Sequence, residues 1–249
     1  MRVDKSFDYF AKYYDILYKD KDYEKEVDFL EDIFRTFHNP KRILEVGCGT
    51  GNYTQILQRK GYDIIGLDVS ENMIRMAKKK CNCDFLVGNA LNVSIDSKFD
   101  TCIAMFAVMG YITKNSDISQ ALKNIHKHLE PNGLFIFDVW NGLAVLRTLP
   151  ELRVKEVENE AVKVVRIAYP VLNAFDHICE VNYKLYALDK TKQTFDEFEE
   201  THIVRFYFPQ EIKLFLEEAR FKVLKICPFL DLNGSVDENV WNITVVGRS

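Results

Sequence analysis

Apolar positions along this chain follow two different spacings. From residue 23 to about residue 140, segments with apolar residues three or four positions apart, typical of amphipathic helices, alternate with short continuous apolar runs. Such runs are typical of strands buried on both faces of a parallel sheet. The first helix is predicted over residues 23–37, and the apolar runs are RILEV, DIIGLDV, CDFLVGNA, DTCIAMF and LFIFDVW. This order predicts an α/β fold with a doubly wound, mostly parallel sheet.

The pattern changes after about residue 150. The run ICEVNYKLYAL at residues 178–188 alternates with period two, which predicts antiparallel strands, and similar runs lie on either side of it. A helix beginning at Pro209 and the runs FKVLKICPF and WNITVVGR then supply two final strands for the main sheet. We therefore expect one domain over residues 1–249, with a seven-stranded sheet and a small antiparallel insertion at residues 150–206 after the fifth strand.

Composition narrows the class of protein. The 249 residues are 47% hydrophobic, enough for a full core, and the net charge of −4 disfavours nucleic acid as a partner. The basic run at residues 78–80 is predicted to be a solvated helix face. We find no membrane span and no signal peptide, and expect a cytoplasmic monomer or homodimer. The six cysteines are scattered without a metal-ligand spacing, so we expect reduced thiols and no metal.

The stretch ILEVGCGTGNY carries the first chemical signal. Gly47, Gly49 and Gly51 follow a predicted strand at alternate positions, where a turn without side chains lets a nucleotide-like ligand approach the backbone. Dinucleotide folds use a G-x-G-x-x-G spacing, and Asn52 stands here where that pattern needs its last glycine. A pyrophosphate is therefore disfavoured.

Two acids point to a different nucleotide-like ligand. Glu45 precedes the turn, and an anion there suits a ligand with an ammonium group and a sulfonium, as in S-adenosylmethionine. Asp68 ends the second predicted strand, where its two oxygens can accept from both ribose hydroxyls of an adenosine. The alternative is an ordinary tight connection, with Asp68 as a helix-start residue.

At these residues the sequence resembles the class I S-adenosylmethionine-dependent methyltransferases. LEVGCGTG, GLDVSENMI, GNAL and LEPNGLFIFDVW match the motifs of that family. The resemblance implies S-adenosylmethionine as the cofactor and S-adenosylhomocysteine as its product. It implies contacts to the methionine end from Glu45, Gly47 and Gly49, to the ribose from Asp68 and Val69, and to the adenine from Asn89, Ala90 and Leu91, with Met73 beside the base.

Two further stretches are similar to the N-methyltransferases that dimethylate deoxyamino sugars, and to their uncharacterised relatives. They are YYDILYKDKDY at residues 13–23 and MFAVMGYI at residues 105–112. The likeness implies Tyr14 and Tyr111 as active-site residues, and places Tyr14, Tyr23 and Phe106 beside the cofactor. We assign the two active-site phenols to positioning the acceptor, since a pKa near ~10 makes a phenol a poor base at neutral pH.

A small-molecule methyltransferase, acting at an amine nitrogen or a hydroxyl, fits these features best. The aromatic segment at residues 1–22 and the insertion at residues 150–206 are expected to act as lids over the methyl group, because the doubly wound core has no closed substrate chamber. An RNA or protein methyltransferase is the alternative, although MFAV stands where an NPPY-type tetrapeptide would. A dinucleotide oxidoreductase or a non-catalytic ligand-sensing domain also stays open.

Overall fold

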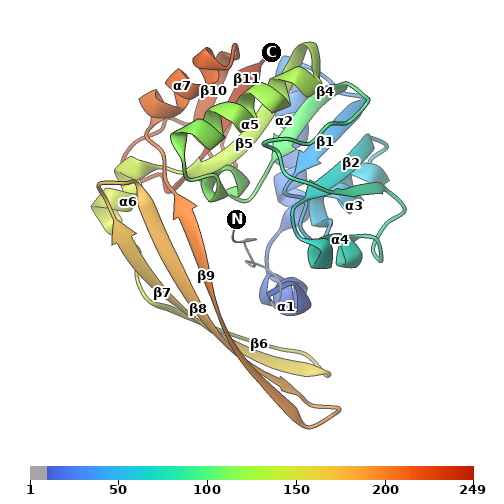
Figure 1. The fold of residues 1–249 in the computed structure, drawn as a ribbon, viewed down its shortest axis with the longest axis vertical. Helices are drawn as coiled ribbons and strands as arrows, with labels where there is room; N and C mark the ends of the chain where they lie inside the picture. The colour runs from blue at the N-terminus through green and yellow to red at the C-terminus, as the bar shows by residue number, and fades with distance from the viewer. Residues whose placement is uncertain (1–9) are drawn as a thin grey trace.

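Two sheets organise residues 10–249, the part of the chain that this computed structural model describes. The larger has seven strands in the order β10-β11-β5-β4-β1-β2-β3, and the smaller has four in the order β6-β7-β8-β9 (Figure 1). The strands of the larger sheet are β1 Arg42–Val46, β2 Asp63–Asp68, β3 Asp84–Val87, β4 Phe99–Ala104, β5 Leu129–Trp140, β10 Lys222–Pro228 and β11 Asn242–Arg248. Those of the smaller sheet are β6 Arg153–Glu158, β7 Val162–Asn173, β8 Ile178–Asp189 and β9 Thr194–Arg205.

The larger sheet is parallel from β5 to β3. β1 pairs in parallel with β2 and β4, β2 with β3, and β4 with β5, whereas β11 and β10 join antiparallel at the far edge. The predicted doubly wound sheet, closed by the two last strands, is confirmed. Its parallel strands present their carboxyl ends at one edge, which is where open α/β sheets bind ligands.

Helices cover both faces of this sheet. The helices of the described chain are α1 Phe10–Leu17, α2 Tyr23–Phe37, α3 Asn52–Arg59, α4 Glu71–Ala77, α5 Asn115–His128, α6 Gly142–Thr148 and α7 Pro209–Glu218, with a 3-10 turn, η1, at Val108–Tyr111. Apolar residues of α5 and α7 share one buried cluster with the sheet, and those of α2 and α3 share a second. The helical periodicity in the sequence reflects these two layers of core.

The smaller sheet, called the inserted sheet below, lies between α6 and α7 in the chain and extends away from the core (Figure 1). The predicted alternation holds in β8: Cys179, Val181, Leu185 and Ala187 are buried, whereas Glu180 is exposed. The face that carries the buried residues is its inner face.

α1 packs on the inner face of the inserted sheet. Phe10 and Leu17 of α1 share a buried cluster with Val164 and Leu185 of the sheet. α1 belongs to the segment at residues 1–22 that the sequence predicts as a lid, and residues 1–9 of that segment lie outside the described part. Figure 1 places α1 between the inserted sheet and the core.

Candidate functional site

The glycine turn after β1 is held against the end of β2. The backbone N–H groups of Gly47 and Cys48 both donate to the carbonyl oxygen of Leu67, at 2.7 and 3.0 Å. A Cβ on Gly47 would lie 2.5 Å from Val108, and one on Gly51 would lie 3.1 Å from Ala77. Packing therefore requires glycine at both of these positions.

Gly49 has a different reason to be glycine. Its φ is +54°, in the left-handed region, and a Cβ there would have no heavy atom within 4 Å. The apex of the turn thus faces open space at the carboxyl edge of the sheet. A ligand can approach the backbone there without a side chain in its way.

Asp68 fixes the turn from the end of β2. One carboxylate oxygen accepts from the N–H of Gly49 at 2.8 Å, and the other accepts from the N–H of Ser70 at 2.8 Å. Burial raises the pKa of Asp68 above its ordinary value, opposed by the backbone N–H bonds from Ser70 and Gly49. Each oxygen retains a lone pair, so the carboxylate can still accept from ribose hydroxyls.

Glu45 lies below the turn and is almost fully buried, with 1% of its surface exposed. Its carboxyl group accepts from the hydroxyl of Thr54 on α3. Burial and the nearby carboxylate of Asp68 together raise the pKa of Glu45 to about 8, against the opposing bond from Thr54. Its predicted contact with the methionine end of the cofactor stays a prediction.

Two exposed valines lie beside Asp68. Val69 is 57% exposed and Val87 is 51% exposed, although both are apolar and lie at the carboxyl edge. Asp68 and Val87 are partners in the β2–β3 register. Unburied apolar surface next to the proposed ribose acceptor suits the flat face of an adenine. The sequence prediction missed Val87; its signal is an apolar residue that ends a strand next to the acid.

The other predicted adenine residues differ in exposure. Asn89 is exposed, but its side-chain oxygen accepts from the N–H of Leu91 at 2.9 Å and so closes a local turn. Ala90 is buried, and Met73 is 2% exposed within α4. The open surface at this edge is therefore provided by Val69 and Val87 more than by Met73.

Tyrosines from separate elements gather at the same edge. Tyr14 and Tyr18 of α1 have ring centroids 4.8 Å apart, and Tyr18 meets Phe106 edge-on at 5.1 Å. Burial raises the pKa of Tyr14 well above 10, and the phenols of Tyr23, Tyr18 and Tyr111 raise it further. The two predicted active-site residues, Tyr14 and Tyr111, are thus near neighbours, and Tyr14 stays a neutral phenol.

Tyr23 supplies a buried phenol oxygen near Asn52 and Tyr14. This oxygen is buried and forms no hydrogen bond within residues 10–249. Burial raises the pKa of Tyr23 to about 12, against the smaller opposite effects of Asn52 and Tyr14. A buried polar atom without a partner, together with the open turn at Gly49, fits a polar ligand at this edge.

The loop after β4 carries Phe106 toward the tyrosines. Phe106 and Ala107 have φ of 70° and 58°, which is strained for residues other than glycine. Their N–H groups donate to the buried carboxylate of Asp138 at the end of β5. Burial raises the pKa of Asp138 to about 6, against these two bonds. Asp138 thus holds this loop in shape.

A hydrogen-bond network joins α1 to the glycine turn. Lys80 donates to Asp15 of α1 at 2.7 Å, to Thr50 at 2.8 Å and to Asn52 at 2.6 Å. Thr50 also donates to Asp15 at 2.6 Å. The prediction that residues 78–80 form a solvated face is wrong for Lys80, because its ammonium reaches back over the turn.

The inserted sheet contributes polar groups from its inner face. The Tyr111 hydroxyl lies 2.9 Å from Nδ1 of His202 on β9. Arg166 of β7 donates to the Tyr18 hydroxyl at 3.3 Å and has its guanidinium carbon 5.2 Å from the Tyr183 ring centroid. Its Nε is buried without a hydrogen-bond partner, and within residues 10–249 no carboxylate forms an ion pair with it. Sequence reasoning did not identify these residues.

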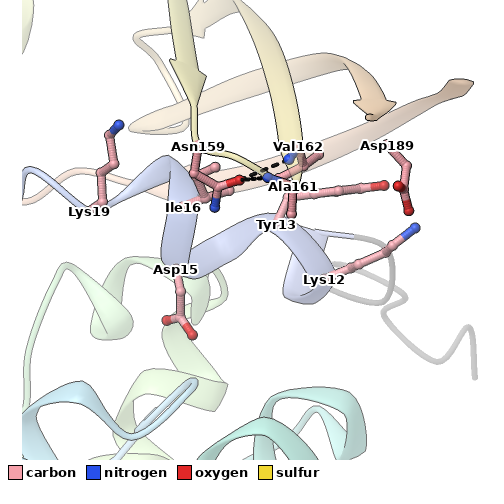
Figure 2. Close-up of a pocket in the computed structure, with 9 residues that line it drawn as sticks. All are labelled: Lys12, Tyr13, Asp15, Ile16, Lys19, Asn159, Ala161, Val162 and Asp189. Atoms are coloured by element: carbon pink, nitrogen blue, oxygen red, sulfur yellow. Dashed lines mark hydrogen bonds between the residues drawn. The ribbon is translucent and has the colours of Figure 1, made fainter. Parts of the chain in front are cut away.

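A separate hollow of about 510 Å³ lies between α1 and the inserted sheet (Figure 2). Its walls include Lys12, Ile16 and Lys19 of α1 together with Asn159 and Val162. Tyr14 and Tyr18 are not among the lining residues. None of the predicted cofactor contacts that the structure describes lines it, so it is distinct from the candidate site.

Comparison with known proteins agrees with this geometry. A family model described as a methyltransferase domain matches residues 43–133. The chain is similar to the putative methyltransferase YqeM of Bacillus subtilis, 22% identical over 87% of each chain. It is similar to the dTDP-3-amino-3,4,6-trideoxy-alpha-D-glucopyranose N,N-dimethyltransferase of Streptomyces venezuelae, 29% identical over 52% of this chain and 56% of the relative.

A solved structure shares the fold. The crystal structure of an S-adenosylmethionine-dependent methyltransferase from Clostridium acetobutylicum superposes with a TM-score of 0.82 and 22% identity, covering 97% of this chain and 98% of that one. Within residues 10–249, none of the helices has the length and apolar character needed to cross a bilayer.

Gly49 and Gly61 offer a matched test of the open turn. Both have left-handed φ and no atom within 4 Å of an added Cβ, but only Gly49 lies at the candidate site. Alanine at either position should cost about 1–2 kcal/mol of unfolding free energy. Gly49→Ala should also weaken S-adenosylmethionine binding tenfold or more by calorimetry, whereas Gly61→Ala should not. Equal affinities would show that the turn does not hold the cofactor.

The raised pKa of Glu45 leads us to expect that the unfolding free energy depends on pH. Its pKa is about 8 in the fold against 4.5 ordinarily, so between these pH values the folded state binds more protons than the unfolded chain. The unfolding free energy should therefore fall as pH rises from 5 to 8. Glu45→Gln should make this fall smaller by roughly 1–3 kcal/mol, measured by urea titration without cofactor. Asp138 contributes a fall of the same sign in both proteins; identical falls would contradict the shift assigned to Glu45.

Proposed function

We propose that this chain, an S-adenosylmethionine-dependent methyltransferase, transfers the methyl group to a small molecule, at an amine nitrogen or a hydroxyl. One observation carries the proposal: α1 and the inner face of the inserted sheet cover the carboxyl edge of the main sheet with aromatic and polar side chains. A site covered in this way suits an acceptor small enough to be enclosed. An RNA or a folded protein would need an open groove.

Cofactor contacts are assigned to the residues that border the open turn. When bound, S-adenosylmethionine supplies an electrophilic methyl carbon on a sulfonium. Asp68 would accept from the ribose hydroxyls, and the backbone at Gly49 would adjoin the methionine end. Val69 and Val87 would cover the adenine, since they are exposed apolar groups. The roles of Gly49, Val69 and Val87 are assigned because each borders open space or is exposed.

The tyrosines are proposed to align the acceptor. An in-line displacement needs the nucleophile, the methyl carbon and the sulfur in one line, and good alignment is worth up to ~7–11 kcal/mol. Tyr14 and Tyr23 stay neutral because burial raises their pKa values. A neutral phenol can donate to or accept from an acceptor without taking its proton. The Phe106 and Tyr18 rings would exclude water from the methyl group.

Arg166 suggests an acceptor that also carries an anionic group. A guanidinium with a buried, unpartnered Nε on the inner face gains most from a phosphate or carboxylate. The Streptomyces venezuelae relative is named for a dTDP-linked amino sugar, which combines an amine with a diphosphate. An amine tethered to such a group would place its two ends on the tyrosines and on Arg166.

A screen of acceptors tests this proposal. The purified protein is given S-adenosylmethionine with amino sugars, nucleotide-linked amino sugars, simple amines and small phenols, beside total RNA and a protein extract. Release of S-adenosylhomocysteine is measured, and we expect turnover with a small amine, faster when it carries a phosphate. Turnover confined to RNA or protein would overturn the small-molecule assignment.

The network at Lys80 tests whether α1 acts as a lid. Lys80→Met removes the bonds from its ammonium to Asp15, Thr50 and Asn52, so α1 should dissociate more readily from the glycine turn. We expect S-adenosylmethionine binding about 3- to 30-fold weaker by calorimetry, because a few partly exposed charge-assisted bonds are lost. Lys79→Met changes an exposed neighbour and should bind normally. Equal affinities in the two variants would argue against a lid.

A further inference from the structure

We infer that His202 and Glu200 of the inserted sheet form a proton relay with Tyr111, which removes a proton from the acceptor amine. The inference rests on the proposed function, since it needs a small-molecule amine as acceptor. It gives the inserted sheet a part in the reaction as well as in covering the site.

The three side chains form a continuous hydrogen-bonded line. The hydroxyl of Tyr111 lies 2.9 Å from Nδ1 of His202, and Nε2 of His202 lies 3.2 Å from a carboxylate oxygen of Glu200. The His202 side chain is 2% exposed and that of Glu200 is 8% exposed. The other oxygen of Glu200 accepts from the N–H of Phe10 at 3.3 Å, which ties the line to α1.

The chemistry of the three side chains determines which atom donates and which accepts in each hydrogen bond. An ionised carboxylate only accepts, so Nε2 of His202 carries the proton that it donates to Glu200. Nδ1 is then the unprotonated nitrogen, and the Tyr111 hydroxyl donates to it. Tyr111 therefore has a proton acceptor behind it. Tyr14 instead lies among the phenols of Tyr23, Tyr18 and Tyr111.

The surroundings of His202 are aromatic. Its ring lies 5.4 Å from that of Phe10 on α1 and 4.8 Å from that of Tyr183 on β8. The titratable groups that face it within residues 10–249 are Tyr111, Glu200 and Tyr183, and Arg166 lies 5.2 Å from the Tyr183 ring centroid. Among residues 10–249, Glu200 is thus a carboxylate placed to stabilise a protonated His202.

The proposed step balances in atoms and charge. The acceptor ammonium gives one N–H proton to the Tyr111 oxygen while the Tyr111 hydroxyl gives its proton to Nδ1 of His202. The acceptor is then a neutral amine and His202 an imidazolium held by Glu200. The nitrogen lone pair forms a bond to the methyl carbon, and the carbon–sulfur bond breaks with its electron pair on sulfur, giving S-adenosylhomocysteine. In this step Tyr111 is the catalytic residue, and His202 and Glu200 act through it.

A purely structural role would give the same contacts, because the Tyr111–His202 bond also fastens β9 to the loop after β4. The two roles differ in pH dependence. A relay is dispensable once the acceptor is deprotonated in solution, whereas a lost structural contact would lower turnover at every pH.

The test compares His202→Gln with unaltered protein over pH 6.5–9.5, using the amine acceptor found in the screen. Gln can bond to Tyr111 but cannot carry the proton. We expect kcat/KM to fall 10- to 100-fold at pH 7, within the range typical of general-base catalysis, and to recover to within about threefold above the pKa of the acceptor. S-adenosylmethionine affinity by calorimetry should not change.

Further variants keep the test decisive. Tyr111→Phe and Glu200→Gln should lose activity at pH 7 and recover at high pH in the same way, and they serve if His202→Gln fails to fold by circular dichroism. His177→Gln lies in the turn between β7 and β8, with its ring centroid 5.3 Å from that of Phe206 and outside the relay, and should follow the unaltered profile. Equal losses at all pH values, or no loss, would overturn the relay. A lack of turnover by the unaltered protein with every small amine would count against the proposed function instead.

Discussion

The bond from the Gly49 N–H to the Asp68 carboxylate is the constraint on which the site depends. It fixes the apex of the β1 turn to the end of β2, and the bonds from Gly47 and Cys48 to Leu67 fix the base of the same turn. Because Leu67 is buried in the core, the crevice inherits the rigidity of the sheet. The open space at Gly49 is therefore a consequence of strand pairing, present without a ligand.

A series of contacts links the glycine turn to α1, α1 to the inserted sheet, and the inserted sheet to the loop after β4. Thr50 donates to Asp15 of α1, Lys80 donates to both, and α1 packs by Leu17 on the inserted sheet. His202 of the inserted sheet contacts Tyr111, which lies at the end of the loop after β4. Asp138 of β5 holds that loop in shape. This circuit of contacts joins the glycine turn, α1, the inserted sheet and the loop after β4. A change at one contact is expected to affect the others, since the elements are joined in series.

The fold could be predicted from the sequence because its signals are local. Continuous apolar runs marked the parallel strands, and the alternation in β8 marked the insertion, as the burial of Cys179 and Leu185 confirms. The glycine turn and Asp68 were also found, since they end strands at readable positions. Contacts between distant elements gave no such signal. In the sequence, Lys80 is one residue of a basic run, and Asp138 is a polar residue near the end of a strand. His202 and Arg166 occupy ordinary alternating positions of strands.

The Tyr111–His202 bond also limits how this architecture can be recombined. The inserted sheet enters and leaves the chain between α6 and α7, so a relative's insertion could be grafted there without interrupting a strand of the main sheet. Residue 111, however, belongs to the part of the chain that forms the main sheet, and residue 202 belongs to the graft. A chimaera that changes the side chain at one position alone would lose the bond that joins the two parts. Exchanging the insertion while keeping this bond therefore requires the two positions to be inherited as a pair.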